Sequence, residues 1–161
     1  SNLNYVTDAN ELDTEMGDVQ VQTTTLEDLI DEYGTFDVIR MDIEGFEAKL
    51  FQDSSRVFLA RLAVGARIFM EVHPERYVSA GYDFHRAVHN LVESGFRKIA
   101  VVSAGSQPAK VLAPFEKHAS ETFKSEKFTR TLFENMPADS IADLCTQLPK
   151  AVRYVIFEKS A

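Results

Sequence analysis

Cysteine is nearly absent from this chain: Cys145 is the one cysteine among 161 residues. A lone cysteine forms no internal disulfide and is typical of a protein that folds in a reducing compartment. No apolar run approaches the roughly 18 residues of a membrane span, and the polar N-terminal stretch has no apolar signal-peptide core. We therefore expect a cytoplasmic protein with no membrane span.

Positive charge is scarce in the first part of the chain. Residues 1–60 contain 14 of the 25 acidic side chains and 3 of the 17 basic ones, and the whole chain has a net charge of −8. Binding to a phosphate backbone requires clustered positive charge. We therefore predict no nucleic-acid partner.

Signature motifs of several enzyme classes are missing as well. The chain has no glycine-rich phosphate loop, no G-x-G-x-x-G turn, no G-x-S-x-G nucleophile turn and no H-E-x-x-H zinc motif. Candidate chemistry must therefore be sought in other polar residues.

The chain length suits one domain with a sizeable core. Residues 1–18 are polar and acidic with few apolar anchors, so we expect a leader or loop there. The remaining residues, 19–161, are predicted to form one α/β domain.

Apolar runs that alternate with helix-like segments predict the order of elements. Three runs, residues 37–43, 67–72 and 97–102, have the composition of buried strands. About 20 residues separate the first two runs, which suits a helical crossover between parallel neighbours. Weaker strands are expected over residues 19–23 and 152–158. Helices are expected over residues 26–33, 46–51, 54–64, 82–93, 120–135 and 140–148.

Polar side chains close the first two predicted strands. Asp42 and Glu44 follow the first strand, and Glu71 and His73 close the second. Ligands of open α/β sheets bind beyond the carboxyl ends of the strands, so these residues are candidates for cation binding, hydroxyl orientation or general-base catalysis. A structural alternative pairs Asp42 with Arg40 and makes Glu44 a helix cap.

Other polar positions carry weaker signals. Gly45 suits either a tight turn or close approach of a ligand to the backbone. His85 and His89 share a helix face, but no third ligand accompanies them, so we interpret them as solvated helix residues. Cys145 has apolar neighbours and is expected to be buried rather than nucleophilic.

The acidic turn after the first buried strand carries a family resemblance. Residues 21–51, VQTTTLEDLIDEYGTFDVIRMDIEGFEAKLF, resemble the most recognisable stretch of FkbM-type methyltransferases. Residues 42–47 (DIEGFE) follow the acidic motif of the family, and Arg40 stands where lysine is usual. Residues 69–73 (FMEVH) resemble the next strand of the family, and residues 95–96 resemble the glycine-aromatic step before the strand after it.

The resemblance implies S-adenosylmethionine-dependent methyl transfer to an oxygen of a small-molecule or glycan acceptor. It also implies a Rossmann-like methyltransferase fold with a mostly parallel sheet and an antiparallel last strand, a role that fits residues 152–158. The cofactor-binding strands of the family precede the matching region, so the chain resembles the C-terminal portion of such an enzyme and lacks those N-terminal strands.

The same resemblance implies roles for individual residues. Asp42, Glu44, Glu71 and His73 are the predicted catalytic residues, with His73 as the candidate base. Asp42 and Gly45 are predicted to lie against S-adenosylmethionine. We assign no metal, although an analogy with catechol-type O-methyltransferases would place a magnesium-like ion on Asp42, Glu71 and His73.

Two other functions remain as alternatives. The chain is alternatively a non-catalytic α/β interaction module derived from the methyltransferase fold, or, less favoured because no hydrolase motif is present, a metal-dependent hydrolase that uses Asp42 and Glu71. Missing first strands would leave a sheet edge uncovered, so we also expect a homodimer through that exposed edge.

Overall fold

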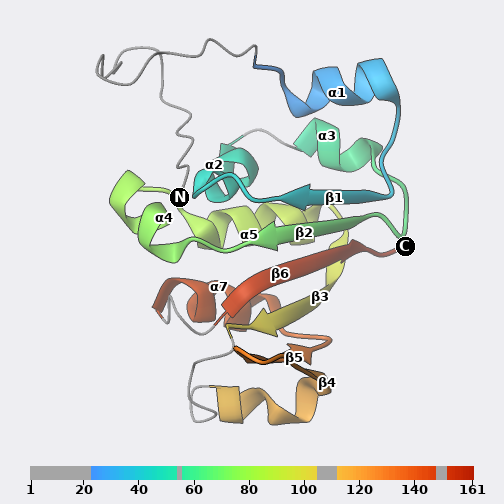
Figure 1. Ribbon diagram of the computed structural model, residues 1–161. Coiled ribbons are helices and arrows are strands. Elements are labelled where there is room, and N and C mark those ends of the chain that lie inside the picture. Colours follow the sequence, from blue (N-terminus) through green and yellow to red (C-terminus); the bar gives the residue numbers. More distant parts are fainter. Residues whose placement is uncertain (1–22, 54–55, 105–111, 148–151) are drawn as a thin grey trace.

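A mixed sheet organises the computed structural model, which describes residues 23–53, 56–104, 112–147 and 152–161 (Figure 1). Within this part of the chain, six strands lie in the order β1-β2-β6-β3-β5-β4. The strands are β1 (Val38–Met41), β2 (Arg67–Glu71), β3 (Phe96–Ser103), β4 (Ala119–Lys124), β5 (Thr129–Phe133) and β6 (Val152–Lys159). The predicted leader over 1–18 and most of the predicted strand over 19–23 lie outside the described residues.

The prediction of a mostly parallel sheet is wrong. β1 and β2 pair in parallel, whereas every other strand pair in the described part of the chain is antiparallel. The reason is the position of β6, which lies between β2 and β3 and runs opposite to both. β1, β2 and β3 therefore share one direction, although β2 and β3 are not neighbours. The predicted antiparallel last strand is confirmed.

The helix predicted over residues 120–135 is also wrong, because this segment forms the β4–β5 hairpin. Its threonines and phenylalanines favour extended backbone. At the turn between the strands, the amide of Ser125 donates to the carbonyl of Phe128, and the Ser125 hydroxyl accepts from the amides of Lys127 and Phe128. Local hydrogen bonds thus close a turn where a helix was expected.

The other predicted helices are present, the first with the predicted bounds and the rest with shifted ends. They are α1 (Leu26–Tyr33), α2 (Phe46–Asp53), α3 (Arg56–Arg61), α5 (Phe84–Glu93) and α7 (Ala138–Gln147). α1 begins where the sequence indicates: the Thr25 hydroxyl accepts from the Asp28 amide at 3.0 Å, and the Asp28 carboxylate accepts from the Thr25 amide at 3.3 Å. Helix α4 (Pro74–Ala80) and the 3-10 helix η1 (Ala113–His118) were not predicted.

The core lies on one face of the sheet, where α5 and α7 pack against β3 (Figure 1). Alternate side chains of β2, β3 and β6 are buried there, namely Ile68, Met70, Ile99, Val101, Val155 and Phe157. Cys145 on α7 is fully buried as predicted, and burial raises the pKa of its thiol. None of the helices in the described ranges has the length and apolar character needed to cross a membrane.

Candidate functional site

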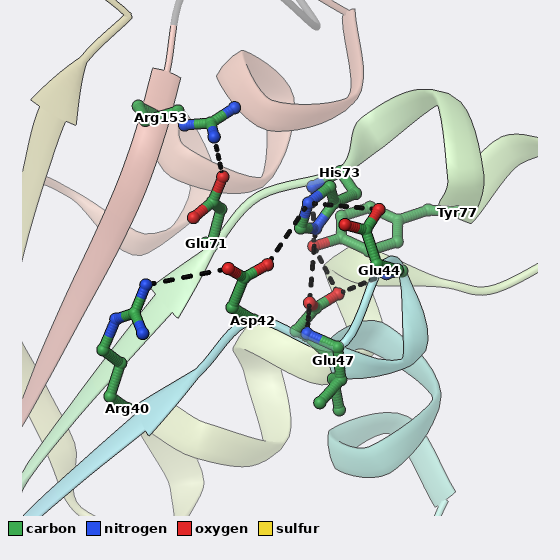
Figure 2. A network of polar contacts seen from close by, with 10 residues as sticks. Arg40, Asp42, Glu44, Glu47, Glu71, His73, Tyr77 and Arg153 are labelled. Atoms are coloured by element: carbon green, nitrogen blue, oxygen red, sulfur yellow. Dashed lines mark hydrogen bonds and ion pairs between the residues drawn. The ribbon is translucent and has the colours of Figure 1, made fainter. Parts of the chain in front are cut away.

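Two parallel strands end side by side, and polar side chains follow each end. β1 leads into a turn that carries Asp42 and Glu44, and β2 leads to His73 at the start of α4. Nε2 of His73 lies 3.7 Å from Oδ1 of Asp42 and 3.8 Å from Oε2 of Glu44 (Figure 2). These three side chains therefore lie together at the ends of the two strands, while their catalytic roles stay predictions.

A fully buried carboxylate lies beneath this group. Glu47, in the first turn of α2, is 0% exposed. Its two oxygens accept the amides of Ile43 and Gly45, each at 2.9 Å, and the hydroxyl of Tyr77 donates to Oε2 at 3.3 Å. Oε1 also lies 3.3 Å from Nδ1 of His73 (Figure 2). Glu47 therefore holds the backbone of the turn that precedes α2.

The turn between β1 and α2 has a conformation that requires glycine. Glu44 has a φ of +55° and Gly45 a φ of +106°, both in the left-handed region that L-residues disfavour. A Cβ atom on Gly45 would lie 2.4 Å from Cβ of Arg76 on α4. Close packing against α4 thus accounts for this glycine, and its contact with the cofactor stays a prediction.

Tyr77 on α4 contacts both His73 and Glu47. Its side chain is 1% exposed and stacks on Phe84 with ring centroids 5.0 Å apart. The Tyr77 hydroxyl accepts from the backbone amide of His73 at 3.2 Å while it donates to Glu47. Burial raises the pKa of this hydroxyl, so it remains a neutral donor.

Glu71, the fourth predicted catalytic residue, has a different partner. It is 4% exposed at the end of β2, and its carboxylate pairs with the guanidinium of Arg153 on β6 (Figure 2). Its pairing with Arg153 distinguishes Glu71 from the carboxylates that contact His73, although its charge adds to the rise in the pKa of His73. Its proposed role toward an acceptor stays a prediction.

Arg40 on β1 lies at the outer side of the group. Its guanidinium lies 3.6 Å from Oδ2 of Asp42, so the pairing considered as a structural alternative is present (Figure 2). Both side chains are exposed, and exposed pairs of this kind contribute little to stability. The ion pair therefore leaves Asp42 available to a ligand.

The charges of Glu47 and His73 support each other. The Glu47 carboxylate raises the pKa of His73 against the opposing effect of burial, and the charges of Glu44 and Glu71 add to the rise. Burial alone would raise the pKa of Glu47, but contacts with His73 and with backbone amides outweigh it, so that pKa is lowered. Each member of the pair therefore favours the charged form of the other.

One ligand atom each of Asp42, Glu44 and His73 lies within 4.8 Å of the others, a spacing that a divalent cation can bridge. The magnesium-like set that included Glu71 is not assembled in the described residues. The guanidinium of Arg40 already pairs with one of the two carboxylates, that of Asp42. We assign no metal here, and that assignment stays a prediction.

The carboxylates of this site suit only the positively charged end of S-adenosylmethionine. The exposed carboxylates of Asp42 and Glu44 suit a positively charged sulfonium or ammonium group. Within the described ranges, however, no strand is followed by a glycine-rich turn that would receive the rest of the cofactor. We therefore place no adenosine site on these residues.

The histidines of α5 lie away from this site. His85 Nε2 lies 3.5 Å from Asp143 and His89 Nε2 lies 3.0 Å from Glu93, and both imidazoles are more than half exposed. Their prediction as solvated helix residues is confirmed.

Sequence reasoning gave no role to Tyr77, and it placed Glu47 in the candidate site through the acidic motif without giving it a role of its own. A signal for Tyr77 was present, because Pro74 is typical of the first turn of a helix and would place Tyr77 one turn after His73. For the partner of Glu71 there was no signal, since Arg153 lies 82 residues away in the sequence.

The chain was compared with family models, curated proteins and solved structures. A family model described as the methyltransferase FkbM domain matches residues 2–98. No curated protein and no solved structure matches the chain.

Proposed function

The chain belongs to the FkbM methyltransferase family, and from this we propose that it carries the acceptor side of an S-adenosylmethionine-dependent O-methyltransferase. The proposed acceptor is a hydroxyl group of a small molecule or glycan. One observation carries the proposal: Nε2 of His73 faces Asp42 and Glu44 at the carboxyl ends of two parallel strands. Ligands of α/β sheets bind at such strand ends.

The two carboxylates are suited to orient a hydroxylated acceptor. Asp42 and Glu44 are 36% and 43% exposed, so their oxygens are open to solvent and to a ligand. A carboxylate accepts hydrogen bonds from hydroxyl groups, and two of them side by side match neighbouring hydroxyls of a sugar or polyol. Holding the acceptor oxygen in line with the methyl group is the main requirement of this reaction.

His73 is suited to take the proton of the acceptor. When bound, S-adenosylmethionine would supply an electrophilic methyl group and leave as the neutral thioether. The residues of this chain would orient the acceptor hydroxyl and take its proton. Neutral His73 accepts that proton on Nε2, and Glu47 stabilises the imidazolium that results. Because the pKa of His73 is raised, the rate should increase with pH as the imidazole loses its proton.

A Rossmann-like methyltransferase core is part of the proposal. β1, β2 and β3 share one direction, and the last strand, β6, runs antiparallel between β2 and β3. An antiparallel last strand is a feature of the seven-stranded sheet in enzymes of this type. The directions of these strands support the proposal that they form the acceptor-side part of such a sheet.

A transfer assay with labelled S-adenosylmethionine tests the proposed function. The protein in its native length is incubated with pools of small molecules and glycans that offer hydroxyl, amine or thiol groups. We expect label in methyl ethers and a loss of transfer in Asp42→Asn, with Glu75→Gln, an exposed acid on α4, as the unaffected control. Absence of transfer would overturn the proposal and favour the non-catalytic module. Label on nitrogen or sulfur alone would overturn the proposed O-methylation.

A further inference from the structure

Glu47 is an unusual residue to find fully buried. A carboxylate is rarely removed from water unless paired charges and hydrogen bonds compensate it. The contacts of Glu47 reach the amides of Ile43 and Gly45 before α2, the imidazole of His73 after β2, and the hydroxyl of Tyr77 on α4. One side chain thus connects the segments that follow both parallel strands.

These contacts determine which way the imidazole faces. Nδ1 of His73 is buried and lies 3.3 Å from Oε1 of Glu47, an ion-pair contact without the geometry of a hydrogen bond. The two ring nitrogens lie on different sides of the ring, so a partner for Nδ1 directs Nε2 elsewhere. Figure 2 shows Nε2 on the side of Asp42 and Glu44, where the acceptor is proposed to bind.

We propose that Glu47 is a positioning residue that fixes the His73 imidazole and the turn of Asp42 and Glu44 against each other, with Nε2 directed at the acceptor. The catalytic consequence rests on the proposed function, whereas the positioning itself rests on the contacts alone. Glu47 does not touch the acceptor; it acts through His73 and through the amides of the turn.

The surrounding charges support this role. His73 is faced by Glu47 from α2, by Asp42 and Glu44 from the turn, and by Glu71 from β2. Tyr77 on α4 is neutral. Glu47 is the acid that lies against Nδ1. Its charge therefore raises the pKa of the ring and also favours one orientation of it.

Glu47→Gln tests the proposal, because it keeps the size of the side chain and removes its charge. The readout is nitrogen-detected nuclear magnetic resonance of the His73 ring over a pH series, in the native-length protein and in the presence of a chelator. We expect the pKa of His73 to fall in Glu47→Gln and to stay unchanged in Glu75→Gln, which changes an exposed acid in the first turn of α4. An unchanged His73 titration in folded Glu47→Gln would overturn the proposal.

Kinetics provide the second readout. A misplacement of about 1 Å lowers a rate by about 100-fold, so kcat should fall by about that factor in Glu47→Gln with little change in KM. If Glu47→Gln does not fold, Glu47→Asp replaces it: the charge is kept, the reach is shorter, and the same fall in kcat is expected with the pH-rate profile shifted. A Glu47→Asp enzyme with wild-type kcat and an unshifted profile would contradict the proposal.

The two proposals fail in different ways. If the wild-type protein transfers no methyl group, the proposed function fails, and the His73 titration still decides the role of Glu47. If transfer is present but Glu47→Gln keeps both the wild-type titration and the wild-type kcat, Glu47 is not a positioning residue and the proposed function stands.

Discussion

At the scale of single residues, the contact between Glu47 and His73 joins the chemistry of the site to the stability of the fold. Each group favours the charged form of the other, and Glu47 also accepts from the backbone amides of Ile43 and Gly45. Such a pair stabilises the native state only while both members are charged. The free energy of unfolding should therefore decline both at lower and at higher pH.

The direction of each effect follows from the shifts in pKa. His73, raised above its ordinary value of 6.5, contributes fully below that value, and its contribution is lost as pH rises through the native pKa. Glu47, lowered from 4.5, contributes fully above that value, and its contribution is lost as pH falls through the native pKa. The free energy of unfolding should be highest between 4.5 and 6.5 and decline on either side.

Thermal melting over this pH range measures the effect in wild type and in His73→Gln. The variant should lose the alkaline decline and melt at a lower temperature within the window. His89→Gln, which alters an exposed imidazole of α5, should leave the profile as it is. A His73→Gln profile with the same alkaline decline as wild type would contradict the pairing.

Gly45 gives a second prediction at this scale. An alanine at a positive φ costs about 1–2 kcal/mol, and crowding of a packed site adds about 1–3 kcal/mol. Gly45→Ala should incur both losses, because its Cβ would lie 2.4 Å from Cβ of Arg76. Gly65→Ala should incur only the first, since its φ is +88° and no atom lies within 4 Å of the added Cβ. Equal urea midpoints for the two variants would contradict the contact with α4.

Much of the site could be predicted at the scale of residues. Asp42, Glu44 and His73 follow two apolar runs, and the alternation of elements implied that the ends of those runs lie together. The burial of Glu47 could not be read in the same way, because a glutamate in the first turn of a helix usually faces water. Its role depends on α4, which the sequence analysis did not predict.

At the scale of elements, the end of α3 depends on a residue of the last strand. Nζ of Lys159 on β6 donates to the carbonyls of Leu59, Ala60 and Leu62 at 2.7, 3.1 and 2.8 Å. The last carbonyls of a helix have no partner within the helix, so one ammonium group here satisfies three acceptors near the end of α3. Burial lowers the pKa of Lys159, but the ring of Phe96 and the carbonyls still surround a cation.

Lys159→Met tests this cap. The methionine keeps the apolar stem and removes the donors, so the free energy of unfolding should fall by about 2 kcal/mol. The matched control is Lys98→Met, which removes an exposed ion pair with Glu158 and should have little effect. Urea denaturation with unchanged slope measures both variants, and a loss in Lys159→Met no larger than in Lys98→Met would contradict the cap.

Whether a strand could be predicted from the sequence depended on how far its side chains are buried. The strands that became β1, β2 and β3 are apolar runs with clear ends, and they were predicted with small errors at their bounds. The β4–β5 hairpin was missed because every residue of β4 is exposed, so no alternation of apolar and polar side chains marks it as a strand. Mixed charges there resemble a solvated helix face.

At the scale of the whole molecule, the position of β6 determines whether most strand pairs of the sheet are parallel or antiparallel. The alternating pattern of residues 152–158 predicts a strand but does not indicate which strands it pairs with. Insertion between β2 and β3 is a long-range pairing, and it changed a mostly parallel prediction into a mostly antiparallel sheet. The cytoplasmic location inferred from the lone cysteine stays a prediction.

Self-association through a sheet edge remains our expectation. Among the described strands, β1 lies at one end of the sheet and pairs only with β2, and Val38 on β1 is 59% exposed. A lysine at an edge opposes strand pairing with another chain. Sedimentation should show a dimer that weakens in Val38→Lys but not in Val57→Lys, which changes an exposed valine on α3. A monomer at all concentrations would contradict the expectation.

The most direct test of the central claim is the rate of methyl transfer by His73→Gln compared with His89→Gln, each in the native-length protein. Removal of a general base lowers a rate by about 10²- to 10⁴-fold, so kcat/KM should fall by that factor in His73→Gln and lose its rise with pH. His89→Gln should match wild type, because His89 lies on α5 and contacts Glu93. A folded His73→Gln enzyme with the wild-type rate and pH profile would contradict the assignment of this site.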